Sequence, residues 1–384
     1  MNVPKIRYDN FTKEWEKVKL SSQASFLQGL TYTPNDVSND GTIVLRSSNI
    51  QNSMVDYNDI VRVNIIIPEK LKIKENDILM CVRNGSKSLV GKTAWLSKNE
   101  EKCTWGAFMN IIRPKERNKF VYYYLNSKYF YNHVWKDLGT ATVNQITKQT
   151  LESCYLNIPS IEEQEKISNT LSLLDQKIKL QSKKIEDLKL FKLYTKNQIF
   201  KDYDESFKLK DILVKWNKKN KNNSVKYVES ISNKYGFISQ SDQFEDRNVA
   251  SKDLNNYYII EKGVFGYNPS RLNVGSLALK TNDKVSVVSP LYECFTTSQN
   301  NQYLLEWFDS KYFRKETISK FEGGVRNTLN FSNLCEIEIG LPTIEKQNMY
   351  SKIFKIFNNK IEFEVKKLYK LQELKKGLLQ SMFV

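Results

Sequence analysis

The chain contains one segment twice, and this repeat constrains the fold more than any other feature. Ile158 to Gln164 (IPSIEEQ) opens one long helical pattern, and Leu341 to Gln347 (LPTIEKQ) opens another. Matched residues are 183 positions apart, as Pro159 and Pro342 are, and this shift holds without a gap to the end of the chain. Repetition at this period predicts duplication of a whole domain together with the helix that follows it.

The repeat also reaches back into the sequence before each helix. Ser127 to Phe130 (SKYF) recurs as Ser310 to Phe313, and Asn144 recurs as Asn327. At 384 residues, the chain has room for two domains of about 140 to 160 residues with connecting helices. We therefore predict an α+β protein with two mixed α/β domains in tandem. The expected boundaries are 1–158 and 202–341 for the domains, and 159–201 and 342–384 for the helices.

Short β-like runs separated by polar turns occupy most of both expected domains, with a helical stretch at Asn118 to Lys136 in the first. The runs in the first domain are Gly41 to Leu45, Val61 to Ile67, Asp77 to Val82, Thr93 to Leu96 and Cys154 to Ile158. Those in the second are Tyr227 to Ser232, Tyr257 to Glu261, Val264 to Tyr267 and Val285 to Ser289.

In both helical segments, apolar residues recur at alternating steps of three and four, which is typical of a coiled coil. Matching registers favour packing of the two helices against each other, although each could instead pack on its own domain. Ser160 and Glu163 fit a capping box, whereas Lys346 replaces the glutamate in the second copy. The pairing positions are Leu171, Leu174, Ile178, Ile185 and Leu188, and Phe354, Phe357, Ile361, Leu368 and Leu371.

A formal net charge of +16 favours a polyanionic partner such as nucleic acid. A lysine-rich composition also produces basic proteins of other kinds, so charge alone is a weak indicator. Arginine is scarce, with ten residues against 49 lysines. Because the guanidinium group suits bidentate contact with phosphate or guanine, the arginines are the more informative residues.

Sequence motifs for catalysis are not convincing. The five cysteines contain no C-x-x-C pair, which argues against a zinc site and a disulfide framework, and His133 is the one histidine. Gly85 to Thr93 (GSKSLVGKT) resembles a P-loop, but five residues separate its glycines where the motif has four. We expect no cofactor or metal in this chain. The N-terminus lacks the apolar stretch of a leader, and no apolar run is long enough to span a bilayer, so we expect a cytoplasmic protein.

The two globular halves, each followed by a proline-initiated helix, resemble the DNA specificity subunit of type I restriction-modification systems. The resemblance covers nearly the whole chain and rests first on the two segments that begin at Pro159 and Pro342. Tyr235 to Gln240 (YGFISQ) and Asn268 to Gly275 are similar to one class of target-recognition domain. Pro4 to Tyr8 with Glu14 to Glu16 also looks like the opening of that family, whereas Lys346 departs from its glutamate.

This resemblance implies that each domain reads one half of a split double-stranded DNA sequence, while the two helices pair antiparallel as a spacer. Two methyltransferase subunits would bind around the helices, and restriction subunits that translocate and cut DNA would join them. S-adenosylmethionine, ATP and Mg would then belong to these partners, and the chain itself would be non-catalytic. Helix length would fix the spacing of the two half-sites, as dimer geometry does in other DNA readers.

Candidate DNA-contacting residues are polar or basic side chains in predicted turns, several of them at matching places in both halves. Those in the first domain are Arg46, Ser47, Ser48, Asn49, Gln51, Arg83, Asn84, Lys87 and Asn144. Those in the second are Ser230, Ser232, Lys234, Tyr235, Arg247, Asn268, Ser270, Arg271, Asn273, Arg326 and Asn327. For any one of them, an exposed turn or a local cap is the alternative interpretation.

Two other functions are consistent with parts of the sequence. A coiled-coil scaffold that binds RNA or protein through basic faces would show little DNA sequence preference and would have no methyltransferase partner. A self-sufficient restriction or methylation enzyme would need a cofactor loop or a metal-ligand cluster, and the sequence offers neither.

Overall fold

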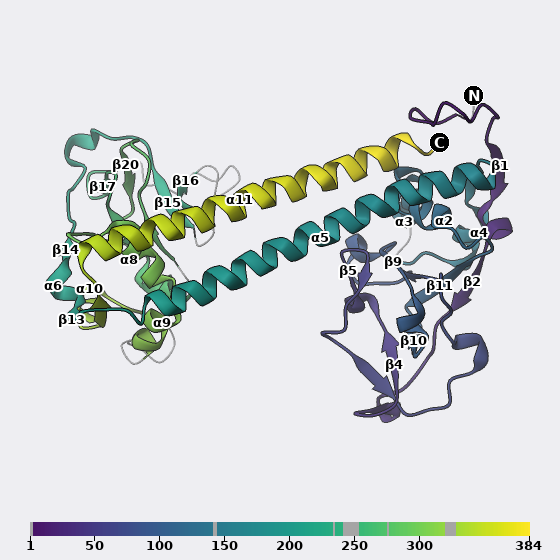
Figure 1. Ribbon diagram of the computed structural model, residues 1–384, viewed down its shortest axis with the longest axis horizontal. Helices are drawn as coiled ribbons and strands as arrows, with labels where there is room; N and C mark the ends of the chain where they lie inside the picture. The colour runs from purple at the N-terminus through teal and green to yellow at the C-terminus, as the bar shows by residue number, and fades with distance from the viewer. Residues whose placement is uncertain (1–2, 141–143, 233–234, 241–252, 275, 319–327) are drawn as a thin grey trace. The chain divides into compact units, whose positions relative to one another are not determined.

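The computed structural model describes residues 3–140, 144–232, 235–240, 253–274, 276–318 and 328–384. The chain forms two compact units, of which the first comprises 1–182 with 366–384 and the second 183–365 (Figure 1). The dividing lines fall inside two long helices, α5 (Ile161–Ile199) and α11 (Ile344–Ser381). Each unit therefore contains one globular part and half of each helix, rather than a contiguous stretch of sequence.

An antiparallel sheet lies at the centre of the first unit, in the order β2 (Ala24–Gln28), β11 (Met109–Pro114), β8 (Ile78–Cys81) and β9 (Thr93–Trp95). Successive side chains of a strand point to opposite faces. Ile78 and Met80 accordingly join one apolar cluster, while Leu79 joins another on the opposite face. Burial on both faces explains why β8 is apolar throughout instead of alternating.

A second sheet and several short elements complete the first unit. This sheet has the order β10 (Cys103–Trp105), β4 (Thr42–Leu45), β7 (Val61–Val63) and β3 (Val37–Ser38). β5 (Ile50–Gln51) and β6 (Met54–Val55) form a separate pair. The helices are α1 (Leu20–Gln23), α2 (Phe120–Leu125), α3 (Lys128–Thr140) and α4 (Lys148–Ser153). β1 (Glu16–Lys19) pairs antiparallel with β12 (Tyr155–Ile158), which leads into α5.

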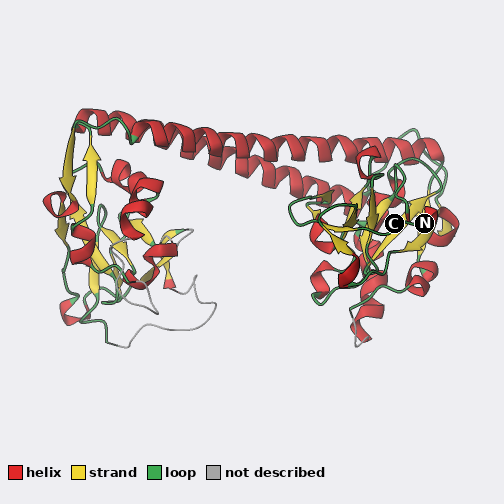
Figure 2. Cartoon of the chain, turned by 90° about the horizontal axis from the view of Figure 1, so that it is seen from below, coloured by secondary structure: helices red, strands yellow, loops and turns green. Residues whose placement is uncertain are grey.

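The second unit repeats this plan with shorter strands, shown in yellow in Figure 2. Its main sheet has the order β14 (Leu213–Lys215), β21 (Glu293–Thr297), β18 (Phe265–Tyr267) and β19 (Leu277–Leu279). β15 (Glu229–Ser232) pairs with β16 (Gly236–Ser239), and β17 (Tyr258–Ile260) with β20 (Ser286–Val288). The helices are α6 (Leu209–Ile212), α8 (Asn301–Phe308), α9 (Lys311–Ile318) and α10 (Phe331–Cys335). β13 (Glu205–Lys208) pairs with β22 (Glu338–Leu341), which leads into α11.

The two long helices are antiparallel within each unit. In the first unit, Lys375 of α11 forms an ion pair with Asp175 of α5 at 2.6 Å. In the second, Phe191 of α5 contacts Phe357 of α11, with ring centroids 5.4 Å apart. The ten apolar positions expected to pair are all buried or half-buried, and Leu171 and Phe354 are fully buried. The step of three and four therefore marks the inner face of both helices.

Each long helix ends inside the globular core from which the other long helix starts. Phe200, which follows α5, packs on Tyr303 and Phe354 of the second unit at centroid distances of 5.4 and 5.9 Å. Phe383, which follows α11, packs on Phe120 of the first unit at 5.1 Å. Both phenylalanines are almost completely buried, so each globular core is completed by the end of a helix that starts from the other part of the sequence.

The helix starts explain the repeated proline and glutamine. Gln164 donates to the carbonyl of Pro159 at 3.1 Å, and Gln347 donates to that of Pro342 at 2.9 Å. The predicted capping box is half right, because the backbone N–H of Glu163 does donate to Ser160 Oγ at 3.4 Å. The carboxylate of Glu163, however, binds a distant arginine instead of turning back, since a buried carboxylate needs a charged partner.

The run Val61 to Ile67 is a strand only in its first three residues, and Ile66 is 95% exposed. Among the residues that the structure describes, no helix combines the length and the apolar content needed to cross a membrane.

Candidate nucleic-acid interface

The first candidate segment is the turn that follows β4. Arg46 forms an ion pair with Asp59 at 2.8 Å, and Gln51 lies exposed at the end of the turn, where it donates to the carbonyl of Ser48 at 3.1 Å. Asn49 departs from the expectation of a DNA-contacting residue. It is fully buried, and its amide donates to the carbonyls of Asp56 and Asp59 at 2.8 Å each. Its side chain holds the turn together and faces no solvent.

The structure brings three predicted segments of the first unit together, although they are far apart in sequence. Asn84 donates from its side chain to Ser47 Oγ at 3.0 Å, which joins the loop after β8 to the turn after β4. Asn144 donates from its side chain to the carbonyl of Gly85 at 3.1 Å, and its own carbonyl accepts from the Asn84 backbone at 3.3 Å. Ser47, Asn84 and Asn144 therefore belong to one surface.

Two cations of this surface lie on exposed aromatic rings that the sequence did not single out. The guanidinium of Arg83 lies 5.1 Å from the ring centre of Phe108, which is 57% exposed. The ammonium of Lys87 lies 4.6 Å from that of Trp135, which is 41% exposed. A cation held over a ring keeps its charge outward with fewer accessible rotamers, which suits contact with a polyanion. Sequence alone gave no indication of Phe108 and Trp135, because ring exposure depends on tertiary packing.

In the second unit, a corresponding turn follows β18. Asn268 Oδ1 accepts from the backbone of Ser270 at 3.0 Å, as Asn84 Oδ1 accepts from that of Ser86 at 2.9 Å. The turn continues into the short helix η7 (Pro269–Val274), where Ser270 and Arg271 are exposed. Both units thus place an asparagine-held turn with an adjacent arginine at the end of a central strand.

The other candidates of the second unit are less uniform. Ser230 is 5% exposed inside β15, so it departs from the expectation of a surface contact. Ser232 is half-buried and Tyr235 is 66% exposed. Lys234, Arg247, Arg326, Asn327 and the side chain of Asn273 lie outside the described residues.

Over the described parts of the chain, no three or more histidine, cysteine, aspartate or glutamate residues gather as a metal site would require. Burial raises the pKa of Cys81 to about 11 and that of Cys294 to about 12, which disfavours a thiolate. The P-loop-like stretch forms the short helix η4 (Lys87–Leu89) and then β9, so no helix follows its lysine and threonine. What this geometry offers is binding through amides, guanidinium groups and ammonium groups.

Comparison with known proteins adds an independent line of argument. Residues 12–190 match the family described as "Type I restriction modification DNA specificity domain". The type I restriction enzyme StySPI specificity subunit of Salmonella potsdam is 29% identical over 167 residues, which cover 42% of this chain and 36% of that protein. The chain therefore spans about a third of the length of that curated relative.

Two further similarities extend over most of the chain. The type I restriction enzyme MjaVIII specificity subunit of Methanocaldococcus jannaschii is 22% identical over 361 residues, or 83% of this chain and 80% of that one. The crystal structure of the S subunit of a type I restriction-modification system from M. genitalium superposes with a TM-score of 0.59 at 15% identity, covering 100% of this chain and 99% of the other. The fold is thus that of tandem domains with long helices, and residues 12–190 are similar to the specificity domain of type I restriction-modification systems.

Proposed function

We propose that this chain selects the DNA sequence for a type I restriction-modification complex, and that each globular part reads one half of a split target. The observation that carries the proposal is the turn present in both units, with Asn84 beside Arg83 and Asn268 near Arg271. Arginine is the side chain that pairs bidentately with guanine in the major groove, and each asparagine holds the turn beside it. One such turn in each unit fits a target made of two half-sites.

The basic charge supports the same proposal. Phosphate contacts position a protein on DNA, while contacts with base edges specify the sequence. A net charge of +16 favours the phosphate contacts. The exposed Arg83 and Arg271 and the half-buried Lys87 lie where they can contribute to both kinds of contact.

We further propose that two methyltransferase subunits dock on the long helices and that restriction subunits complete the assembly. Large apolar side chains on the outer faces of both helices support docking, because exposed apolar residues of this number mark interaction surfaces. In the first unit they are Leu173, Leu180, Tyr369 and Leu374, and in the second Leu190, Leu193, Tyr194, Ile356, Phe363 and Val365. Methyl transfer from S-adenosylmethionine and Mg-dependent use of ATP would belong to those partners.

The test is a map of methylated adenines in the source cell with the gene intact, deleted, or carrying Arg83→Ala or Arg271→Ala. Deletion should erase methylation at one two-part motif. Each arginine variant should weaken discrimination at one half of that motif by roughly 10- to 100-fold, the worth of one bidentate contact. Lys262→Ala is the matched control. Its ammonium lies 2.9 Å from a carboxylate oxygen of the exposed Asp283, and neither residue belongs to these turns.

Persistence of every methylated motif after deletion, with an active methyltransferase in the cell, would rule out sequence selection by this chain. Loss of discrimination at the same half-site in both arginine variants would contradict the assignment of one half to each unit.

A further inference from the structure

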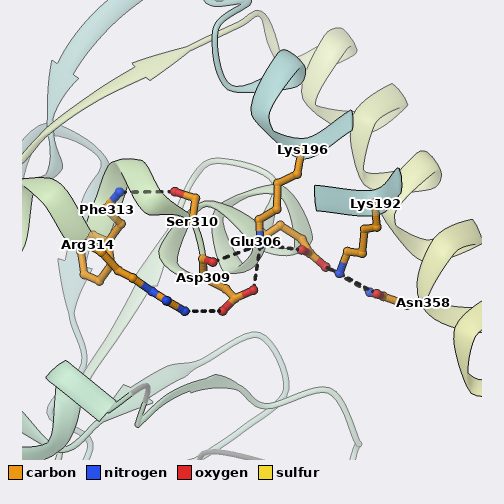
Figure 3. Close-up of polar contacts among 8 residues, drawn as sticks. All are labelled: Lys192, Lys196, Glu306, Asp309, Ser310, Phe313, Arg314 and Asn358. Carbon is orange, nitrogen blue, oxygen red and sulfur yellow. Dashed lines mark hydrogen bonds and ion pairs between the residues drawn. The ribbon is translucent and has the colours of Figure 1, made fainter. Parts of the chain in front are cut away.

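A buried polar cluster joins the globular part of the second unit to both long helices (Figure 3). Lys192 of α5 donates to Glu306 Oε1 of α8 at 2.8 Å and to Asn358 Oδ1 of α11 at 2.7 Å. Asn358 donates to the same Glu306 oxygen at 3.1 Å. The side chain of Glu306 is 7% exposed, so this carboxylate depends on its partners.

A second lysine enlarges the cluster. The ammonium of Lys196 lies 3.1 Å from Glu306 Oε2 and 2.8 Å from Asp309 Oδ2, and its side chain is 5% exposed. Arg314 lies on the outer side of Asp309 at 3.5 Å. Burial alone would raise the pKa of Glu306, but the charges of Lys196 and Lys192 outweigh it and lower the pKa. Two lysines of α5 thus face two carboxylates of the globular part.

The first unit has the same joint with its charges arranged differently. Shifting by 183 positions matches Glu306 to Tyr123, Asn358 to Asp175 and Lys192 to Lys375. The hydroxyl of Tyr123 donates to Asp175 Oδ2 at 2.8 Å, and Lys375 lies 2.6 Å from Asp175 Oδ1. In the second unit the carboxylate, Glu306, lies on the globular part. In the first unit the carboxylate, Asp175, lies on the long helix α5.

At three further matched positions, the side chains of the two units also differ. Asp309 corresponds to Asn126, Lys196 to Leu379, and Gln302 to Lys119, whose ammonium lies 3.4 Å from Ser172 Oγ of α5. Over all six matched positions, the second globular part carries two carboxylates toward a helix site with two lysines. The first carries a lysine and two neutral side chains toward a helix site with one carboxylate and one lysine.

We propose that this arrangement of charges makes the two helix sites selective, so that each accepts its own globular part and disfavours the other. The first part, placed on the second site, would bring Lys119 to Lys192 and Lys196 without Glu306 or Asp309. The second part, placed on the first site, would bring Glu306 and Asp309 to Asp175, with Lys375 as the one helix lysine for three carboxylates. Burying like charges without partners costs several kcal/mol, whereas each native joint is compensated. The inference rests on the proposed function only in treating these parts as DNA readers, and it limits which reader can occupy which position.

The sharpest test moves one carboxylate across the joint with almost no change in shape. In the full chain, Glu306→Gln should lower the melting temperature by about 5–10 °C, because Lys192 loses its carboxylate. Asn358→Asp should also lower it, because the new carboxylate lies beside Glu306. The double variant reproduces the arrangement of the first unit and should recover more than half of the loss. Asp283→Asn, which neutralises an exposed ion pair, is the control and should leave the melting temperature unchanged.

Additive losses in the double variant would overturn the proposal, because they would show that the position of the carboxylate does not matter. Recovery is the expected result. Neither measurement involves DNA, so failure here would leave the proposed function intact.

A second experiment tests the consequence directly. A full chain in which 20–154 and 209–337 are exchanged should melt at least about 10 °C below the native chain or fail to fold. Four helix substitutions that exchange the two sites should restore it, namely Asp175→Asn, Leu379→Lys, Asn358→Asp and Lys196→Leu. Native stability of the simple exchange, or no improvement from the four substitutions, would contradict the selectivity of the sites.

Discussion

The starts of the two long helices occupy equivalent places in the two units, yet their charges are reversed. In the first unit, Glu163 accepts from Arg7 at 2.8 Å through both of its oxygens and from Trp15 Nε1 at 3.3 Å. In the second, the matching residue is Lys346, whose ammonium lies 3.3 Å from Asp204 and 3.6 Å from Asp202. Each helix start is therefore tied to the segment that precedes its domain, by a carboxylate in one case and by an ammonium in the other.

This reversal shows that duplication has preserved the complementarity of contacts and not the residues themselves. The substitution of Lys346 for the glutamate, which looks like a weakened motif in the sequence, is matched by the change from Arg7 to two aspartates. The two ion pairs nevertheless differ in how deeply they are buried. The side chain of Glu163 is 1% exposed, whereas that of Lys346 is 39% exposed, so removing one partner of the first pair should destabilise the protein more.

The largest effects should come from the helix ends, where the two units are most alike. Phe383→Ala and Phe200→Ala each remove a ring buried among aromatic residues and should each lower the free energy of unfolding by about 3–5 kcal/mol. Hydrogen exchange will separate the two. Phe383→Ala should speed exchange in β8 and β11 of the first unit, and Phe200→Ala should speed it in β18 and β21 of the second.

Phe363→Ala serves as the control, because this ring of α11 is 61% exposed and its loss should hardly change the stability of the isolated chain. If Phe383→Ala accelerated exchange in β18 and β21 alone, α11 would not complete the core of the first unit.

The next effect tests the reversed ion pairs. Glu163→Gln leaves Arg7 without its carboxylate and should lower the free energy of unfolding by about 3 kcal/mol. Lys346→Gln removes an exposed ion pair and should have a small effect that disappears at 1 M salt. Denaturant unfolding followed by tryptophan fluorescence measures both, since Trp15 contacts Glu163 in the first unit and Trp307 is buried in the core of the second. Equal losses in the two variants would contradict the difference in burial.

The sequence predicts the long helices well and the sheets only in part. α5 and α11 lie within the expected 159–201 and 342–384, because a period of three and four is a local signal. β11, one of the two central strands of the first sheet, is not among the predicted runs. It contains Asn110, Arg113 and Pro114, and Arg113 fits there because its guanidinium pairs with the buried Asp77 at 2.7 Å. Such a strand depends on tertiary partners that no local pattern reveals.

In the candidate interface, too, some features have a local sequence signal and others depend on tertiary packing. Turn chemistry in the sequence identified Asn84 and Asn268, whose side chains hold turns through hydrogen bonds to nearby backbone groups. Asn49 has the same chemistry, but its donors point inward to two carbonyls. Exposure is a property of the assembled fold, so residue type alone could not distinguish the buried asparagine from the others.

The smallest effect uses the cysteines as reporters of the two units. Cys81, Cys103 and Cys154 of the first unit and Cys294 of the second are buried, whereas Cys335 of the second is half-buried. Burial raises the pKa of Cys81 to about 11 and that of Cys294 to about 12, so the thiolate fraction at pH 8 is very small.

A thiol reagent at pH 8 should therefore modify Cys335 first and the four buried cysteines only as their unit opens. Peptide mass analysis over time measures the order, and Cys335→Ser should abolish the early phase. In Phe383→Ala, labelling of Cys154 should accelerate while that of Cys294 stays slow, because Cys154 shares the core that Phe383 completes. Equal acceleration at Cys154 and Cys294 would mean that the two units open together and that the matched cores, despite separate packing, are one cooperative structure.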